Sequence, residues 1–235
     1  MNNGPVLFFG IFLTLASSFW GVLLMPQLQI GQQQVVSLDT GAQYPVPRAG
    51  IAQQGAEVYR ASGCAECHTR QVRPANEGGD IARGWGKRRS VAQDYLYDTP
   101  VLLGNLRVGP DLANYGVRQT NVTEVLKLLY KPAAIGQGAM PAYPYLFKRT
   151  KLANGQKLSP GAIQIPGEPA DIEITPKPEA EELAEYLVSL RADVPLFEAP
   201  IPGAQAKAAL PADQGTNAPA TNAPGTNAAA APTGK

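Results

Sequence analysis

Residues 64–68 read Cys-Ala-Glu-Cys-His, and this short stretch decides how the rest of the chain is interpreted. C-x-x-C-H is the attachment pattern of c-type haem. Two thiols form thioethers with the haem vinyl groups, and the two intervening residues let both sulfurs reach one porphyrin edge. The following histidine is then placed under the iron. The sequence therefore predicts one covalently bound haem c, held by Cys64 and Cys67, with His68 as an axial ligand.

Three other sites use similar residues, and each fits less well. A thioredoxin-like redox pair also has C-x-x-C, but no clear strand precedes this motif and a helix is expected directly before it. A disulfide across so short a loop would constrain little of the chain. A zinc site needs about four ligands, whereas the chain contains one His and two Cys.

The second axial ligand follows from the scarcity of ligand residues. His68 is the chain's single histidine, so a second histidine ligand from this chain is excluded. Of the three methionines, Met1 and Met25 lie at the apolar N-terminus and Met140 lies in the globular part. Pro141 biases Met140 towards an extended loop conformation. We expect Met140 to bind the iron, which raises the reduction potential and leaves no open site. A buried core methionine and lysine ligation are the alternatives.

Two further residues are predicted near the haem. The carbonyl of Pro110, in Gly-Pro-Asp-Leu at 109–112, is a natural acceptor for the second ring nitrogen of His68. Arg107 is a candidate partner for a haem propionate, with a solvated surface arginine as the equal alternative. A basic run is interpreted as a solvated face, with propionates or an acidic partner as the alternative; it comprises Arg83, Lys87, Arg88 and Arg89.

The N-terminus is apolar. Residues 5–25 contain no charge, and about 20 such residues in a helix span the roughly 30 Å core of a bilayer. We interpret residues 1–26 as a single transmembrane anchor. A cleaved signal peptide is the alternative, but it normally has a positive start, and no Lys or Arg precedes this run. The first basic residue after it is Arg48, too distant to predict orientation.

The remaining sequence divides by composition. Residues 27–50 are rich in Gln, Gly and Pro and are predicted to be a tether with a short extended piece near Val36. Residues 51–198 are predicted to form one mainly α domain, with a loop excursion or small hairpin at about 148–178. The Ala/Pro/Asn/Thr-rich residues 199–235 are predicted to be a disordered tail.

Three helices are expected within this domain. Residues 51–61 form the first, with Gly55 as a close-packing position. Residues 123–130 form the second, capped by Asn121 or Thr123. The third follows Pro178, and its apolar stripe consists of Leu183, Tyr186, Leu187 and Leu190.

With these features in view, the chain resembles the membrane-anchored mono-haem cytochrome c subunit of cbb3-type cytochrome c oxidases (subunit II, the FixO-like family). The similarity covers roughly residues 50–147 and the anchor. Its motifs, in order, are Cys64 to His68, Gln71-Val72-Arg73-Pro74, Ser90-Val91, Tyr97-Asp98-Thr99-Pro100, Leu103-Gly104, Arg107 to Leu112, and Met140-Pro141-Ala142-Tyr143-Pro144. The 148–178 excursion and the tail are longer than is usual in the family.

The resemblance implies a class I cytochrome c fold with long loops, with His68 and Met140 as axial ligands. It implies a single-pass protein of the bacterial inner membrane with its haem domain on the periplasmic side. Such a subunit is not an enzyme by itself. It takes electrons from another cytochrome c and passes them to the haem-copper catalytic subunit.

The implied partners are therefore that subunit, other cytochrome c subunits and the lipid bilayer. Neither nucleic acid, which a net charge of +1 disfavours, nor a small-molecule substrate is expected. A free-standing, membrane-tethered electron shuttle is the alternative function. An open-site haem enzyme or gas sensor is a third hypothesis, which requires that Met140 does not bind iron.

Overall fold

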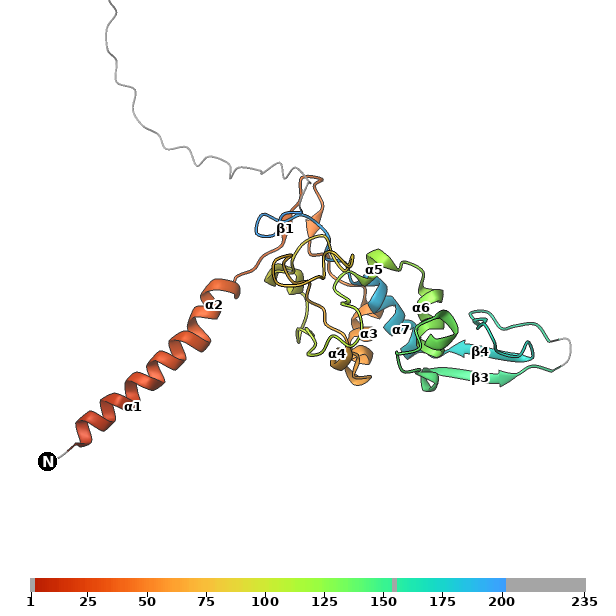
Figure 1. The fold of residues 1–235 in the computed structure, drawn as a ribbon, viewed down its shortest axis with the longest axis horizontal. Helices are drawn as coiled ribbons and strands as arrows, with labels where there is room; N and C mark the ends of the chain where they lie inside the picture. Colours follow the sequence, from red (N-terminus) through yellow and green to blue (C-terminus); the bar gives the residue numbers. More distant parts are fainter. Residues whose placement is uncertain (1–2, 154–155, 202–235) are drawn as a thin grey trace, which may run out of the picture.

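The computed structural model describes residues 3–153 and 156–201 of the chain. The described part is mainly helical, with two small two-stranded sheets. Figure 1 shows a long N-terminal helix that projects away from a domain formed by the other described elements. The predicted tail lies outside the described residues from position 202 onwards.

One uncharged helix occupies residues Gly4–Ile30. It consists of α1 (Gly4–Phe19), a π-helical turn η1 (Trp20–Leu24) and α2 (Met25–Ile30). None of its residues is buried by the rest of the chain. At 1.5 Å per residue the helix is about 40 Å long, which exceeds the roughly 30 Å core of a bilayer. By length and composition it can cross a membrane, as the sequence predicts for its N-terminal part.

The helix continues past Pro26, although the tether was expected to begin at residue 27. Proline lacks an N–H, and in a regular α-helix its ring clashes with the carbonyl four residues earlier, here that of Val22. The π-helical turn adds one residue to the preceding turn, and the Met25 N–H donates to the Trp20 carbonyl five residues earlier. This wider turn accommodates the proline, so the helix ends at Ile30 instead.

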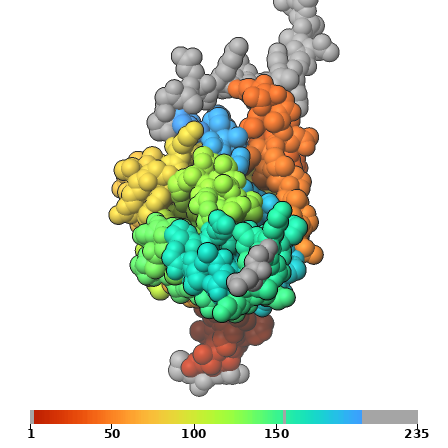
Figure 2. Space-filling model, turned by 90° about the vertical axis from the view of Figure 1, so that its right-hand side faces the viewer, coloured from red at the N-terminus to blue at the C-terminus, as the bar shows by residue number. Residues whose placement is uncertain are grey.

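The rest of the expected tether folds back onto the domain. Strand β1 (Val36–Ser37) pairs antiparallel with β2 (Gln43–Tyr44), in the region where an extended piece was predicted. In the space-filling view, the orange surface that precedes and includes the first domain helix runs along one flank of the domain (Figure 2). We call residues 34–48 the docked segment.

Buried polar contacts hold the docked segment in place. The Tyr44 ring is buried, and its hydroxyl donates to Asp94 Oδ1 at 2.7 Å. Arg48 pairs with Asp98, whose side chain is 4% exposed. These residues are attached to the domain and do not form a free linker along their whole length.

The three predicted helices are confirmed. They are α3 (Gly50–Ala61), α6 (Val122–Tyr130) and α7 (Pro178–Ser189). Asn121, one of the two proposed caps, accepts a hydrogen bond from the Thr123 N–H at 2.9 Å. Each helix buries one apolar face, as its sequence period requires.

Helices α3 and α7 cross at the centre of the domain. At Gly55 in α3, an added Cβ would lie 1.9 Å from the Glu182 carbonyl oxygen, so only glycine fits this crossing. Next to it, the buried rings of Tyr59 and Tyr186 pack with centroids 5.3 Å apart. Residues 64–68 follow α3 directly, so this crossing fixes where they begin.

The excursion at 148–178 forms a hairpin that extends from the domain (Figure 1). Strand β3 (Phe147–Lys151) pairs antiparallel with β4 (Ile172–Pro176), and Lys151 faces Ile172 in the register. The connection folds back, because Ile163 bridges to Ile174 and both side chains are buried in the core. The small hairpin considered for this segment is therefore present.

Short turns connect the main helices: α4 (Cys64–Cys67), α5 (Tyr115–Arg118) and the 3-10 turns η2 (Ala92–Tyr95), η3 (Pro132–Ile135) and η4 (Pro144–Leu146). The long connection between α4 and α5 contains η2 as its one helical element. Its backbone is stabilised by buried charged side chains, chiefly Arg70, Asp80, Arg88 and Asp111.

Candidate haem-binding site

A sharp turn between α3 and α4 presents the two cysteines. Gly63 lies between α3 and α4. Its φ of 70° is a left-handed conformation that favours glycine. Cys64 and Cys67 are the first and last residues of the single turn α4. Residues three apart in a helix lie on the same side, so both thiols are offered to one ligand edge. No disulfide joins them.

The chemistry of these residues disfavours the redox-pair and zinc interpretations. Burial raises the pKa of the Cys64 thiol to about 11, whereas a thiol-disulfide exchange site needs a thiolate near neutral pH. Across residues 3–153 and 156–201, no group of three or more His, Cys, Asp or Glu side chains is arranged to hold a metal ion.

His68 is held in the form that binds metals. Its Nδ1 lies 2.8 Å from the carbonyl oxygen of Pro110. A carbonyl can only accept, so in the neutral imidazole Nδ1 carries the proton and Nε2 keeps its lone pair. Among the described residues, Nε2 has no hydrogen-bond partner. The arrangement matches metal-bound histidines, whose second ring nitrogen donates to a carbonyl or carboxylate.

Two glycines allow the 104–112 loop to lie directly against His68. An added Cβ at Gly109 would be 2.2 Å from the imidazole Cε1, and one at Gly104 would be 2.1 Å from the His68 carbonyl oxygen. The Gly109 N–H donates to the Cys67 carbonyl at 2.9 Å. The sequence shows both glycines as motif residues but does not reveal this packing role, because the close approach of distant segments leaves no local signal.

The Met140 loop reaches the same part of the domain. Met140 is half-buried and packs against the hydrophobic core, and its N–H donates to the Gln137 carbonyl at 3.1 Å. Three residues later, the Tyr143 side chain lies beside the Cys64 thiol and partly offsets the effect of burial on the pKa of that thiol. The structure thus brings the methionine loop to the cysteine turn, and iron ligation by Met140 stays a prediction.

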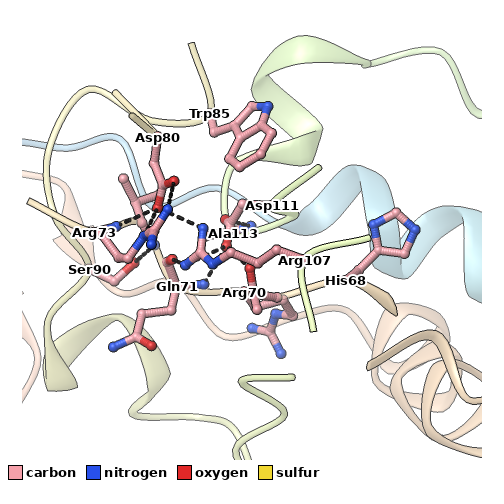
Figure 3. A network of polar contacts seen from close by, with 12 residues as sticks. His68, Arg70, Gln71, Arg73, Asp80, Trp85, Ser90, Arg107, Asp111 and Ala113 are labelled. Atoms are coloured by element: carbon pink, nitrogen blue, oxygen red, sulfur yellow. Dashed lines mark hydrogen bonds and ion pairs between the residues drawn. The ribbon is translucent and has the colours of Figure 1, made fainter. Parts of the chain in front are cut away.

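Arg107 has partners within the protein. Its Nη1 lies 2.7 Å from Asp80 Oδ2 and its Nη2 donates to the Gln71 carbonyl at 2.6 Å. Arg73 binds the same Asp80 carboxylate at 3.0 Å. Figure 3 shows this cluster, with the His68 imidazole directed away from Asp80. Arg107 is therefore not a free surface arginine. Its contact with a haem propionate stays a prediction.

The Asp80 carboxylate is fully buried but remains charged. Burial alone would raise its pKa, yet hydrogen bonds and charge from Arg73 and Arg107 lower the pKa to about 2. An ion cluster of this kind fixes the loop that precedes Pro110 because breaking one partner leaves an uncompensated buried charge.

The solvated-face interpretation of the basic run is wrong for one residue. Arg83, Lys87 and Arg89 are exposed, but Arg88 is 2% exposed and binds Asp94 at 2.7 Å. Arg88 Nε also donates to the Val194 carbonyl. A charge run read from sequence cannot reveal which of its members has a buried partner far along the chain.

Taken together, the side chains fit a covalently held haem. The thiols of Cys64 and Cys67 lie on one helical turn, and the next residue, His68, has an Nε2 without a hydrogen-bond partner among the described residues. The chain has one such motif, so the set suits one haem. Attachment and ligation by these residues remain predictions.

Two comparisons with known proteins bear on this site. The family model described as "Cytochrome C oxidase, mono-heme subunit/FixO" matches residues 3–176. The match includes the N-terminal helix, the cysteine turn, the Pro110 and Met140 loops and both strands of the hairpin. No curated protein matches the chain.

Proposed function

Because the chain belongs to the FixO family of mono-haem cytochrome c oxidase subunits, we propose that it passes electrons to the haem-copper catalytic subunit of a cbb3-type oxidase. It is an accessory subunit of the oxidase and is anchored by its N-terminal helix. The proposal assigns oxygen chemistry to the partner and single-electron transfer to this chain.

The observation that carries the proposal is the contact between His68 Nδ1 and the Pro110 carbonyl. It presents an unprotonated Nε2 beside two free thiols. In the proposed site, Cys64 and Cys67 would hold the haem, and His68 and Met140 would be the protein ligands of its iron. When bound, the haem supplies a metal centre that gains and loses one electron. With two protein ligands, the iron would keep no open position for a substrate.

We assign the domain to the class I cytochrome c fold, with long loops. The crossing of α3 with α7 and the placement of the cysteine turn directly after α3 support this assignment. We further propose that the helix is a permanent anchor and that the domain lies on the periplasmic side of a bacterial inner membrane. Covalent haem attachment takes place on that oxidising side.

The direct test is isolation of the native complex from membranes in mild detergent. We expect this chain to co-migrate with a large subunit that contains b-type haem and copper, and to keep its haem colour after denaturation. The double variant C64A/C67A is expected to lose the denaturation-resistant haem. A chain that migrates alone contradicts the subunit assignment and favours the shuttle. A colourless wild-type chain contradicts haem attachment.

Ligation by Met140 has its own matched test. We expect the methionine-to-iron charge-transfer band of the oxidised protein to vanish in Met140→Leu and to persist in Met25→Leu, which changes the membrane helix alone. A band that persists in Met140→Leu removes this residue as a ligand and reopens the enzyme or sensor hypothesis.

The free shuttle is the weaker candidate on structural grounds. It relies on a long, flexible tether, whereas residues 34–48 are attached to the domain through Tyr44 and Arg48. A domain that is held close to its membrane helix suits a fixed partner in the same membrane.

A further inference from the structure

We propose that Asp111 is a positioning residue that holds the Pro110 carbonyl on His68 and so sets the reduction potential of the haem. This inference rests on the proposed function. It concerns a carboxylate to which the sequence analysis gave no role.

Asp111 connects the two segments that flank the His68–Pro110 contact. Its Oδ2 accepts from the Thr69 hydroxyl and from the Gln71 N–H, both at 2.7 Å. Thr69 follows His68 directly. Oδ1 accepts from the Ala113 N–H at 2.9 Å, which shapes the turn after Pro110. One side chain thus holds the chain after the histidine against the chain after the proline.

Backbone hydrogen bonds alone leave this arrangement incomplete. The Gly109 N–H binds the Cys67 carbonyl at 2.9 Å and the Leu112 N–H binds the Thr69 carbonyl at 2.8 Å. These two bonds fix the residues around Pro110 but leave the Thr69 hydroxyl and the Gln71 N–H without partners. Asp111 supplies both acceptors, so its removal frees the segment that carries His68.

Asp111 and Asp80 differ in how closely cations pair with their carboxylates. Both carboxylates are fully buried. Asp80 has close guanidinium contacts from Arg73 and Arg107, at 3.0 and 2.7 Å. For Asp111 the nearest ion-pair contact is Arg107 Nη2, 4.0 Å away. The Arg118 guanidinium also lies nearby, on the Asp111 backbone carbonyl. The Asp111 carboxylate is therefore less closely paired than that of Asp80, and a buried negative charge stabilises the oxidised, more positive iron.

Both effects of Asp111 act in the same direction on the potential. A firm Pro110 contact strengthens the Nδ1 hydrogen bond and makes the imidazole a stronger donor to the iron. The carboxylate charge favours the oxidised state directly. Asp111→Asn removes the charge and replaces one carboxylate oxygen by an NH2 group, so either the Ala113 N–H or the Thr69 and Gln71 donors lose their acceptor. It should therefore raise the reduction potential and loosen the His68 contact.

The experiment uses the full-length, haem-loaded chain in detergent and compares three variants. Asp111→Asn is the main perturbation. Thr69→Val removes one hydrogen bond to Asp111 without changing the charge. Asp80→Asn is the matched control, because it neutralises another fully buried carboxylate that contacts the same Arg107. We measure the potential by spectroelectrochemical titration, and the solvent exchange of the His68 Nδ1 proton by NMR of the reduced protein.

We expect Asp111→Asn to raise the potential and to speed the exchange of the Nδ1 proton at least tenfold. Thr69→Val should speed this exchange without the charge effect, and it keeps the idea testable if Asp111→Asn fails to load haem. Asp80→Asn should speed the exchange less than Asp111→Asn does, because it loosens the loop before Pro110 but leaves the contacts of Thr69 and Gln71 with Asp111 intact. Normal exchange in both Asp111→Asn and Thr69→Val, or equally fast exchange in Asp80→Asn, overturns the proposal. Absence of covalent haem in the wild type instead overturns the proposed function.

Discussion

A methyl group at Gly55 should disturb the crossing of α3 and α7. In Gly55→Ala the new Cβ would lie 1.9 Å from the Glu182 carbonyl oxygen and 2.7 Å from the Tyr186 Cβ. A carbon and a carbonyl oxygen need about 3.3 Å, so the helices must separate by about 1.4 Å. The first obstacle is backbone, so a side-chain rotation cannot relieve it.

The size of the effect follows from two opposing contributions. Overpacking a dense core costs about 1–3 kcal/mol, and a backbone obstacle places this case near about 3 kcal/mol. Alanine in a helix interior regains about 1 kcal/mol relative to glycine. The net loss in the free energy of unfolding is therefore about 2 kcal/mol. In a domain of this size it lowers the melting temperature by roughly 4–8 °C.

Thermal unfolding followed by circular dichroism measures this loss, with variants compared in the same haem-loaded state. Gly50→Ala is the matched control, because it adds the same methyl group to the same helix at a position with no atom within 4 Å. We expect it to be neutral or slightly stabilising. Equal melting temperatures for Gly55→Ala and the wild type would refute the close-packing explanation, as would an equal loss in the control.

Three further predictions concern the site and its supports. Gly109→Ala places a methyl group 2.2 Å from the His68 Cε1, which should break the Pro110 contact and add a high-spin fraction to the absorption spectrum. Because the folded-state pKa of Asp80 is lowered to about 2, its contribution to stability is present above about pH 4. Urea unfolding should show that contribution being lost as the pH falls from about 4 towards 2. Arg48→Gln should make the amides of the docked segment exchange at least tenfold faster in hydrogen-exchange mass spectrometry.

Each of these predictions has a control that leaves the contact intact. Gly50→Ala adds a methyl group outside the site, where no atom lies within 4 Å, so its spectrum should be that of the wild type. Asp80→Asn should remove the loss of stability between pH 4 and 2. Arg60→Gln changes an exposed arginine whose partner Glu57 is also exposed, and exchange in the docked segment should be normal. Identical behaviour of a variant and its control would contradict the corresponding explanation.

The helices of this fold are predictable from local sequence, because each has an apolar period or a cap that can be recognised within its own residues. The apolar stripe that includes Leu183 and the cap at Asn121 are each visible within one or two turns of sequence. Gly55 is visible as a small residue on the apolar face of its helix. The path of residues 27–50 is not predictable in this way. Tyr44 is buried and Arg48 is largely covered because carboxylates 50 positions later bind them. Composition alone indicated a solvated linker there.

The same division applies to the candidate site. The spacing of Cys64, Cys67 and His68 and the isolation of Met140 are visible in the sequence, because few other residues bind haem iron. The charged groups that hold the site together are less visible. Asp80 and Asp111 resemble ordinary loop residues until the structure shows their buried partners. An aspartate directly after Gly-Pro, able to accept several hydrogen bonds in a turn, is the one local signal that indicates such a role.

The shortness of the free chain above the membrane has a kinetic consequence. The membrane helix ends at Ile30, and the Gln34 carbonyl already accepts from the Gln93 side chain. Four Cα–Cα steps span at most about 14 Å, so the proposed anchor would hold the domain close to the membrane surface. Confinement of this kind replaces diffusional encounter by an effective concentration that short linkers raise to about millimolar. Electron transfer to a partner subunit held in the same complex, as proposed, would then be a first-order process, independent of how dilute the protein is.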